Sequence, residues 1–345
     1  MRLTYSVTPP NLTTPTERRR AIARAQSALI ASLPIDGLLV YDVQDESSRN
    51  PEPRPFAFCP KVDPLTYAFE ELDVQLPRVV YRAVTGTDAP ALRTWLDRLR
   101  AGGGRAVLVG APTPDAPRSL TLTEAYAICR SHSPELCFGG VVIPERHAAI
   151  GAEDARVWTK AQQGCTFFVS QTVWSVDAAK RLLLDLSRRA EREGTGAPPL
   201  LLTFSPCGSP QTLQFQEWLG VEIPPAIKRE LLSASDMFAR SVELAAESFT
   251  ELRAFADAQG LTVGCNVESV SSRLTEIQAS EALVRAIDRL GRGAADRAGP
   301  ASDCAEQGTG ILARDDVELA RTHTSGHSAS HARTEFISAD RQIRD

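Results

Sequence analysis

Acidic residues stand directly after several apolar, β-branched runs of the sequence. Asp42 and Asp45 follow one run, Glu145 follows another and Glu268 follows a third. A carboxyl group at such a position can act as a general acid or base when burial raises its pKa toward neutrality. Each has a plainer alternative. Asp42 and Asp45 precede a proline-rich loop and could be solvated there, and Glu268 could pair with Arg273.

Basic and amide side chains near the same runs suggest ligand recognition. Arg82 lies within an apolar run, where its guanidinium needs a carboxylate partner from the protein or from a ligand. Gln171 interrupts the run FFVSQTVW, and a buried amide can bind the donor–acceptor edge of a heterocycle. His147 and Lys160 have structural alternatives, a hydrogen-bonded core histidine and a solvated helix lysine.

The sequence contains no Ser-His-Asp order, no phosphate-binding glycine loop and no metal-ligand cluster of recognised spacing. His323, His327 and His331 recur every four residues, which on a helix would place them on one face. The Ser, Gly and Thr residues around them disfavour a helix, so we predict no metal site. By themselves the residues indicate an enzyme with a polar pocket and do not name its reaction.

Eight short runs rich in Val, Ile, Leu and Phe are the candidate strands. Several, such as VVYRAV and LLLTF, are almost continuously apolar, as is typical of parallel strands that are covered on both faces. The eight predicted strands are 3–7, 37–43, 78–84, 105–109, 137–143, 167–173, 200–204 and 261–267.

Segments with helical periodicity alternate with these strands. The predicted helices are 16–31, 91–100, 120–130, 153–163, 176–193, 224–232, 236–258 and 273–290. Eight β/α units in about 290 residues predict an α/β protein with a (β/α)8 TIM barrel fold. A doubly wound open sheet is less consistent, because no G-x-G-x-x-G follows the first strand. In a barrel, the residues at the C-terminal ends of the strands form the site.

Composition sets the remaining boundaries. The chain has 345 residues, of which 43% are hydrophobic, and 38 basic and 43 acidic residues give a net charge of −5, which argues against a nucleic-acid partner. We expect no membrane span and no secretory signal, and the seven cysteines without a disulfide pattern favour a reducing cytoplasm. We predict a barrel domain over 1–292 and a flexible polar tail over 293–345, with a short helix near 315–320.

Several motifs in the second half keep a recognisable order. They are VVIPERH (141–147), a helix that carries Lys160, QGCTFFVSQTVWSV (163–176), PLLLTFS (199–205), WLGVEIP (218–224) and NVESVSSRLTE (266–276). In this order and spacing the chain resembles the methylenetetrahydrofolate reductase family. The resemblance extends over about 1–290 and is specific in the second half.

The resemblance implies a barrel that acts on a tetrahydrofolate derivative with NAD(P)H as reductant and, usually, FAD as hydride relay. It implies cofactor-binding roles for His147 and Lys160, against the phosphate and ribose part of the flavin. Tyr81 stands where the family has a flavin-contacting histidine. Gln171 would face the pterin or the flavin edge, and Arg273 the folate or nicotinamide side of the site. Asp42, in the place of a family threonine, and Arg82 complete the expected substrate-binding set.

Two positions differ from the family pattern. Ser6 stands where the family has the glutamate that assists opening of the folate ring, and Gly110-Ala111 stands where it has an aspartate beside the flavin. A flavin-free reductase, which passes hydride directly from nicotinamide to folate, would not need that aspartate. Because serine cannot act as the acid, we expect Asp45, Glu145 or Glu268 to replace it, and the sequence leaves open which one.

The first hypothesis is therefore an NAD(P)H-dependent oxidoreductase that reduces 5,10-methylenetetrahydrofolate to 5-methyltetrahydrofolate. The second is a folate-dependent transferase that passes the one-carbon unit to another substrate, and the third is a catalytically silent folate-binding protein. Whether the chain forms a homo-oligomer is left open. All three hypotheses predict that His147, Gln171 and Arg273 converge on one cavity at the mouth of the barrel.

Overall fold

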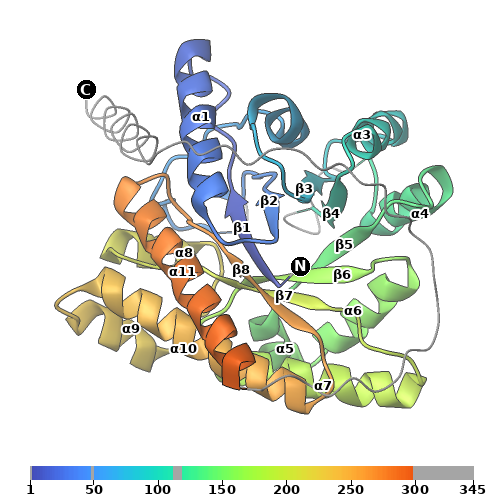
Figure 1. Ribbon diagram of the computed structural model, residues 1–345. Helices are drawn as coiled ribbons and strands as arrows, with labels where there is room; N and C mark the ends of the chain where they lie inside the picture. Colours follow the sequence, from blue (N-terminus) through green and yellow to red (C-terminus); the bar gives the residue numbers. More distant parts are fainter. Residues whose placement is uncertain (1, 48–49, 112–118, 298–345) are drawn as a thin grey trace.

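Eight parallel strands form a closed barrel in the computed structural model, which describes residues 2–47, 50–111 and 119–297. The strands pair in chain order, and the last returns to pair with the first, Thr4 opposite Asn266. Figure 1 shows the helices around the outside of this ring. The predicted TIM barrel is confirmed. Its strands are β1 (Leu3–Val7), β2 (Gly37–Val40), β3 (Arg78–Ala83), β4 (Arg105–Val109), β5 (Phe138–Val142), β6 (Phe167–Thr172), β7 (Leu200–Phe204) and β8 (Val263–Val267).

The helices follow the predicted alternation, with additional short elements. They are α1 (Thr16–Ser32), α2 (Pro64–Thr66), the π-helical turn η2 (Tyr67–Glu71), α3 (Ala89–Ala101), α4 (Leu122–His132), α5 (Pro144–Ile150), α6 (Glu153–Gln162), α7 (Val176–Glu193), α8 (Pro210–Trp218), α9 (Pro225–Ser233), α10 (Met237–Ala258) and α11 (Leu274–Arg297). The sequence reading missed α2, η2, α5 and α8. It also ended the last helix at Leu290, whereas α11 continues to Arg297. The predicted helix near 315–320 and the three spaced histidines lie outside the described residues.

Side-chain caps fix where several helices begin. Asp88 accepts a hydrogen bond from a backbone amide in the first turn of α3, Ser175 does the same for α7, and Thr121 and Glu124 form a reciprocal capping box at α4. Each cap satisfies amides that a helix leaves without an internal partner. These helices therefore start at positions set by local sequence.

The inside of the barrel is divided between an apolar side and a polar side. The apolar side comes mainly from β2, β3, β4 and β6, with buried Leu39, Val79, Val107 and Val169. The polar side comes from β1, β7 and β8, where Thr4, Ser6, Thr203 and Asn266 are all buried. Buried polar groups are costly unless they bond to one another, so the polar side is expected to form a network.

A register shift interrupts β6. Val169 pairs with Leu201 of β7, but the next pair is Thr172 with Thr203, so β6 contains one residue more than β7 over this stretch. The hydroxyl of Ser170 fills the gap in the ladder, where it accepts a hydrogen bond from the amide of Thr203 at 2.8 Å. This bulge changes which side chains beyond Val169 face the barrel interior.

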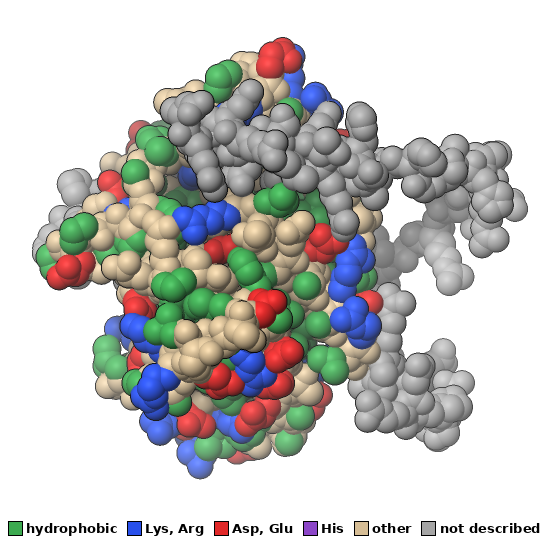
Figure 2. Space-filling view, turned by 90° about the vertical axis from the view of Figure 1, so that its left-hand side faces the viewer, with side chains coloured by type: hydrophobic (Ala, Val, Ile, Leu, Met, Phe, Trp, Pro, Cys, Tyr) green, Lys and Arg blue, Asp and Glu red, His purple; other side chains and the backbone are tan. Residues whose placement is uncertain are grey.

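The outer surface carries mixed charges. Figure 2 shows the face that lies on the left of Figure 1, where basic and acidic side chains are interspersed over the lower half rather than gathered by sign. Among the described residues, no helix is both long enough and apolar enough to span a membrane.

Candidate functional site

Asn266 is the centre of a buried polar network on the inside of the barrel. Its Oδ1 lies 2.7 Å from Ser6 Oγ and 3.0 Å from Thr4 Oγ1. Its Nδ2 donates to the hydroxyl oxygen of Tyr41 at 3.0 Å and to Thr203 Oγ1 at 3.1 Å. The side-chain amide thus uses both donors and both acceptor sites, and it connects β1, β7, β8 and the residue that follows β2.

Glu268 lies next to this network, one residue beyond the end of β8. Its Oε1 accepts a hydrogen bond from Thr172 Oγ1 at 2.7 Å, and the hydroxyl of Tyr41 also stabilises its charged form. Burial outweighs these bonds and raises the pKa of Glu268 above its ordinary value. The same burial, with the charge of Glu268 nearby, raises the pKa of Tyr41 and of Tyr81, whose ring contacts Tyr41 edge to face at 4.7 Å.

The bulge in β6 explains how Thr172 reaches Glu268. In a regular strand, the next inward residue after Val169 would be Gln171, and it would lie opposite Thr203. The hydroxyl of Thr203 faces inward, because it accepts a hydrogen bond from Asn266. The extra residue instead gives this position to Thr172. Gln171 is displaced, and its Nε2 makes a long 3.4 Å hydrogen bond to the carbonyl of Leu219, which follows α8. Regular alternation would thus place Gln171 inward, whereas the structure places its neighbour Thr172 there.

Ser6 and Glu268 are both hydrogen-bond partners of the Tyr41 hydroxyl group. Ser6 Oγ lies 3.0 Å from the Tyr41 hydroxyl oxygen, and Tyr41 is also a hydrogen-bond partner of Glu268. β1 and β8 are adjacent in the barrel. The carboxyl group of Glu268 thus lies within one hydroxyl group of Ser6.

The two other predicted acids differ from Glu268. Asp45 is exposed, and hydrogen bonds from the amide and hydroxyl of Ser47 lower its pKa. Glu145, at the start of α5, is buried, and neither of its carboxyl oxygens has a hydrogen-bond partner among the described residues. Burial is the main cause that raises the pKa of Glu145 to about 7. Of the three predicted acids, Glu145 and Glu268 therefore have a raised pKa, and of these Glu268 bonds to Tyr41.

Arg82 and Asp42 are held by protein partners at the ends of β3 and β2. Arg82 donates to Thr87 Oγ1 at 3.0 Å and lies 3.7 Å from a carboxylate oxygen of Asp63, the residue that caps α2. Asp42 accepts a hydrogen bond from the amide of Ala83 at 2.8 Å. The partner that Arg82 requires is thus supplied by the protein, and the pair fixes the segment that leads into α2.

His147 and Lys160 lie behind the barrel wall. His147 is buried, with Nε2 3.0 Å from a carboxylate oxygen of Asp185 in α7 and Nδ1 accepting from the amide of Glu153 in α6. Lys160 donates to the carbonyl of Val141 at 2.7 Å. The expected convergence of His147 with Gln171 and Arg273 is not observed, because the imidazole is bonded between helices instead of facing the mouth.

Arg273 and Gln171 both border the α8 region. Arg273 donates to Gln211 and Ser209 at the start of α8, and its guanidinium carbon lies 5.2 Å from the centre of the Phe56 ring. It contacts these groups rather than Glu268, so the alternative in which the two simply neutralise each other is not observed. Two of the three side chains expected at the mouth thus lie along one helix and its following loop.

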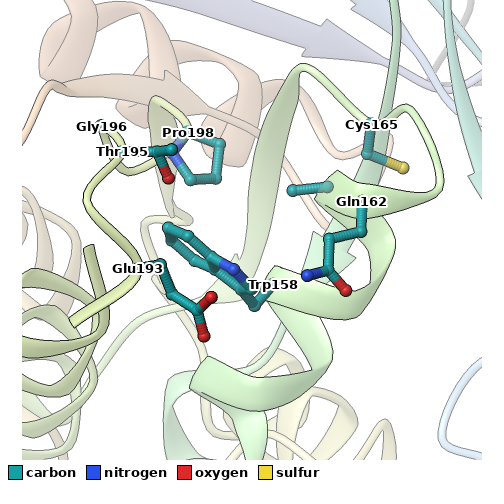
Figure 3. A pocket seen from close by; sticks show the side chains of 8 residues that line it. Trp158, Gln162, Cys165, Glu193, Thr195, Gly196 and Pro198 are labelled. Atoms are coloured by element: carbon teal, nitrogen blue, oxygen red, sulfur yellow. The ribbon is translucent and has the colours of Figure 1, made fainter. Parts of the chain in front are cut away.

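A separate hollow lies at the opposite end of the barrel. It has a volume of about 390 Å³ and is lined by the ends of α6 and α7 and by residues that precede β6 and β7, among them Cys165 and Pro198. Figure 3 shows the Trp158 ring at its centre, between Glu193 and Gln162. Burial raises the pKa of the Cys165 thiol to about 11, so it is protonated near neutrality. No group of three potential metal ligands occurs among the described residues.

The sequence reading did not single out the groups that organise the mouth. Tyr41 connects Ser6 to Glu268, Asn266 and Thr203 extend the network on the side of Ser6, and Thr172 bonds to Glu268. One signal was present, since Thr4, Ser6, Thr203 and Asn266 are polar side chains within otherwise apolar strands. Such residues need partners across the barrel, and that requirement indicates a network.

No protein-family model matches the chain, and no curated protein matches it significantly. Solved structures with related folds include oxaloacetate acetylhydrolase in complex with oxalate (11% identity, 99% of this chain, 91% of that chain, TM-score 0.39). They also include the carboxyl transferase domain from Rhizobium etli pyruvate carboxylase (10% identity, 86% of this chain, 47% of that chain, TM-score 0.42). Neither is similar enough to bear on function.

A third structure is much more similar. It is an uncharacterized protein from Clostridium thermocellum that binds two copies of 5-methyl-5,6,7,8-tetrahydrofolic acid. The alignment has 34% sequence identity and a TM-score of 0.72, and it covers 84% of this chain and 95% of that chain. Similarity of this extent in sequence and fold shows common descent, and the chain belongs to the same barrel family as this Clostridium thermocellum protein.

Proposed function

We propose that the protein binds a reduced folate at the C-terminal mouth of the barrel and reduces 5,10-methylenetetrahydrofolate to 5-methyltetrahydrofolate with NAD(P)H. The observation that carries the proposal is the ligand of the Clostridium thermocellum relative, 5-methyltetrahydrofolic acid, which is the product of this reaction. The motif order that resembles methylenetetrahydrofolate reductases supports the same chemistry independently of that ligand.

Glu268 is the proposed proton donor. In the reaction, a proton is added to N10 of the substrate, the bond between N10 and the bridging carbon breaks, and an iminium ion forms between that carbon and N5. Hydride from the nicotinamide then adds to the carbon and gives the methyl group. A carboxyl group whose pKa is raised by burial keeps its proton closer to neutral pH, which this step requires.

The other two carboxyls fit this role less well. The lowered pKa of Asp45 keeps it ionised near neutrality. Glu145 has a raised pKa, but its carboxyl makes no hydrogen bond to the network around Tyr41. Glu268 combines a raised pKa with a place beside Ser6, the position of the missing acid.

The residues implied to hold FAD do not fit a flavin in this chain. His147 and Lys160 are bonded to protein groups behind the strands. Gly110 and Ala111, after β4, provide no carboxylate. We therefore propose direct hydride transfer from NAD(P)H to the folate. Gln171, held by one long hydrogen bond, is free to exchange it for the edge of the pterin, and Arg273 is placed to bind the benzoylglutamate side.

The test is an assay of the purified protein with NADH or NADPH and 5,10-methylenetetrahydrofolate. The reaction is monitored through the absorbance of the reduced nicotinamide. We expect oxidation of the nicotinamide only when the folate is present, with 5-methyltetrahydrofolate as product. A colourless protein with this activity would support direct transfer. Oxidation that depends on a different acceptor would contradict the proposal.

The Clostridium thermocellum ligand also fits a second function. 5-Methyltetrahydrofolate is a methyl donor as well as a reduction product, so the same pocket could serve a methyl or methylene transferase. Carbon-labelled methylenetetrahydrofolate separates the two functions. In a reductase the label stays on folate as a methyl group, and in a transferase mass spectrometry finds it on a second substrate. Folate binding without turnover of either kind would identify a silent binding protein.

A further inference from the structure

Arg54 lies in the long segment between β2 and α2 and packs into a set of aromatic rings. Its guanidinium carbon is 5.0 Å from the ring centre of Trp218, 5.3 Å from that of Phe215 and 5.4 Å from that of Phe58. The side chain is only 12% exposed. Aromatic faces attract the guanidinium but accept no conventional hydrogen bonds from it.

Hydrogen-bond donors of Arg54 are left without partners in this enclosure. Its Nε and NH1 have no hydrogen-bond acceptor among the described residues. The nearest carboxylate, that of Asp45, is 3.9 Å from NH1 and is itself 53% exposed. A guanidinium that is desolvated and under-bonded costs free energy, and an anion that accepts from these N–H groups would recover it.

Two further cations extend this positive region. Lys61 donates to Asn11 Oδ1 at 2.6 Å, and burial together with the charge of Arg54 lowers its pKa, so the two charges lie close to each other. On the other side of the aromatic rings, Phe215 contacts Phe56 edge to face, and Phe56 lies against Arg273. A row of contacts therefore joins Arg273 to Arg54 through aromatic rings, of which Phe215 is buried, and Lys61 lies near Arg54.

We propose that Arg54, assisted by Lys61, binds the glutamyl-tail carboxylates of the folate, an inference that rests on the function proposed above. A folate tail consists of an aromatic benzoyl group followed by carboxylates, and γ-linked glutamates add further carboxylates in a row. In this row, aromatic rings are followed by the cations Arg54 and Lys61, and in the tail the benzoyl ring is followed by carboxylates. The planar guanidinium can hold a carboxylate through two parallel hydrogen bonds.

Trp218 gives a direct probe of this site, because its ring lies against Arg54. Quenching of tryptophan fluorescence would measure the affinity of the wild type and of Arg54→Gln for three compounds: 5-methyltetrahydrofolate with three glutamates, the same folate with one, and a tetrahydropterin without a tail. We expect Arg54→Gln to weaken the triglutamate about tenfold or more, the monoglutamate less, and the tetrahydropterin not at all. Arg54→Lys should recover part of the loss.

Arg93→Gln on the exposed face of α3 is the matched control and should change none of the three affinities. Circular dichroism would check folding, and Lys61→Gln gives a second variant if Arg54→Gln does not fold. An equal loss for the tetrahydropterin would make Arg54 a packing residue and overturn the inference. A wild type that binds no folate at all would remove the proposed function itself, whereas a wild type that binds all three equally would remove only this inference.

Discussion

The two ends of the barrel differ in what their side chains can do. At the C-terminal mouth, a carboxyl with a raised pKa, a tyrosine hydroxyl and a fully bonded amide come from strands that are far apart in sequence. At the N-terminal end, a hollow of about 390 Å³ is lined by Trp158, Pro198 and small or exposed groups. A hollow alone is therefore a poor guide to function in this fold. We place the proposed function at the end with the buried titratable groups, which is where the sites of such barrels generally lie.

The largest expected effect is on activity and comes from removing the proton donor at the mouth. Glu268→Gln should lower kcat/KM about 10²- to 10³-fold, because it removes the proton donor and keeps its size. In the wild type, activity should fall as the pH rises through the raised pKa of Glu268, since only the protonated carboxyl donates. The variant should lose this dependence. Steady-state rates across pH would measure both effects.

Glu193→Gln in the N-terminal hollow is the matched control and should leave kcat/KM within about twofold of the wild type. The affinity of Glu268→Gln for 5-methyltetrahydrofolate should be nearly unchanged. If both glutamine variants lost activity equally, the functional distinction between the two ends would be wrong.

A smaller effect concerns stability at the edge of the mouth. Glu145 titrates near pH 7 in the folded protein and near its ordinary value of 4.5 when unfolded. The folded state therefore binds more protons between these values, and the free energy of unfolding should fall by up to about 3 kcal/mol as the pH rises through this window. Glu145→Gln should lack this decrease.

Urea unfolding of the wild type and of Glu145→Gln at pH values below and above the window would measure the difference. The variant should gain stability relative to the wild type as the pH rises. An identical pH dependence in the two proteins would show that Glu145 is ionised and solvated in the folded state.

The smallest effect is expected at the N-terminal hollow. A Cβ atom at Gly196 would meet no atom within 4 Å, so Gly196→Ala can be accommodated without rearrangement. We expect a change in the free energy of unfolding within about 0.5 kcal/mol and no change in folate affinity. Thermal unfolding and fluorescence titration would measure these. Weaker folate binding in this variant would extend the binding site to the N-terminal end.

The barrel itself was predictable because its signals are local. Three of the eight predicted strands match the observed limits at both ends, and the other five differ by one to three residues at an end, since apolar runs and helical periodicity are properties of short segments. The missed elements α5 and α8 are short, and each begins at a proline, Pro144 and Pro210, in its first turn. Proline at that position is typical of helix starts, so a signal was present.

The site was less predictable because it depends on register and on closure of the ring. Regular alternation along β6 would place Gln171 inward, but one extra residue in β6 gives that place to Thr172. The bond between Tyr41 and Glu268 joins positions that are distant in sequence, and only the pairing of β1 with β8 brings them together. His147 occupies a family motif position in the sequence, but its ring is hydrogen-bonded between α6 and α7 instead of facing the mouth of the barrel.

The polar network around Asn266 can form only when the last strand is in place. Asn266 lies in the last strand and Glu268 directly after it, while Thr4 and Ser6 lie in the first strand and Tyr41 directly after the second. A growing chain that stops before residue 263 contains most of the helices but lacks both the amide and the carboxyl. We therefore expect the proposed activity to appear only when β8 has paired with β1 and closed the barrel. Chains truncated before β8 should have no activity.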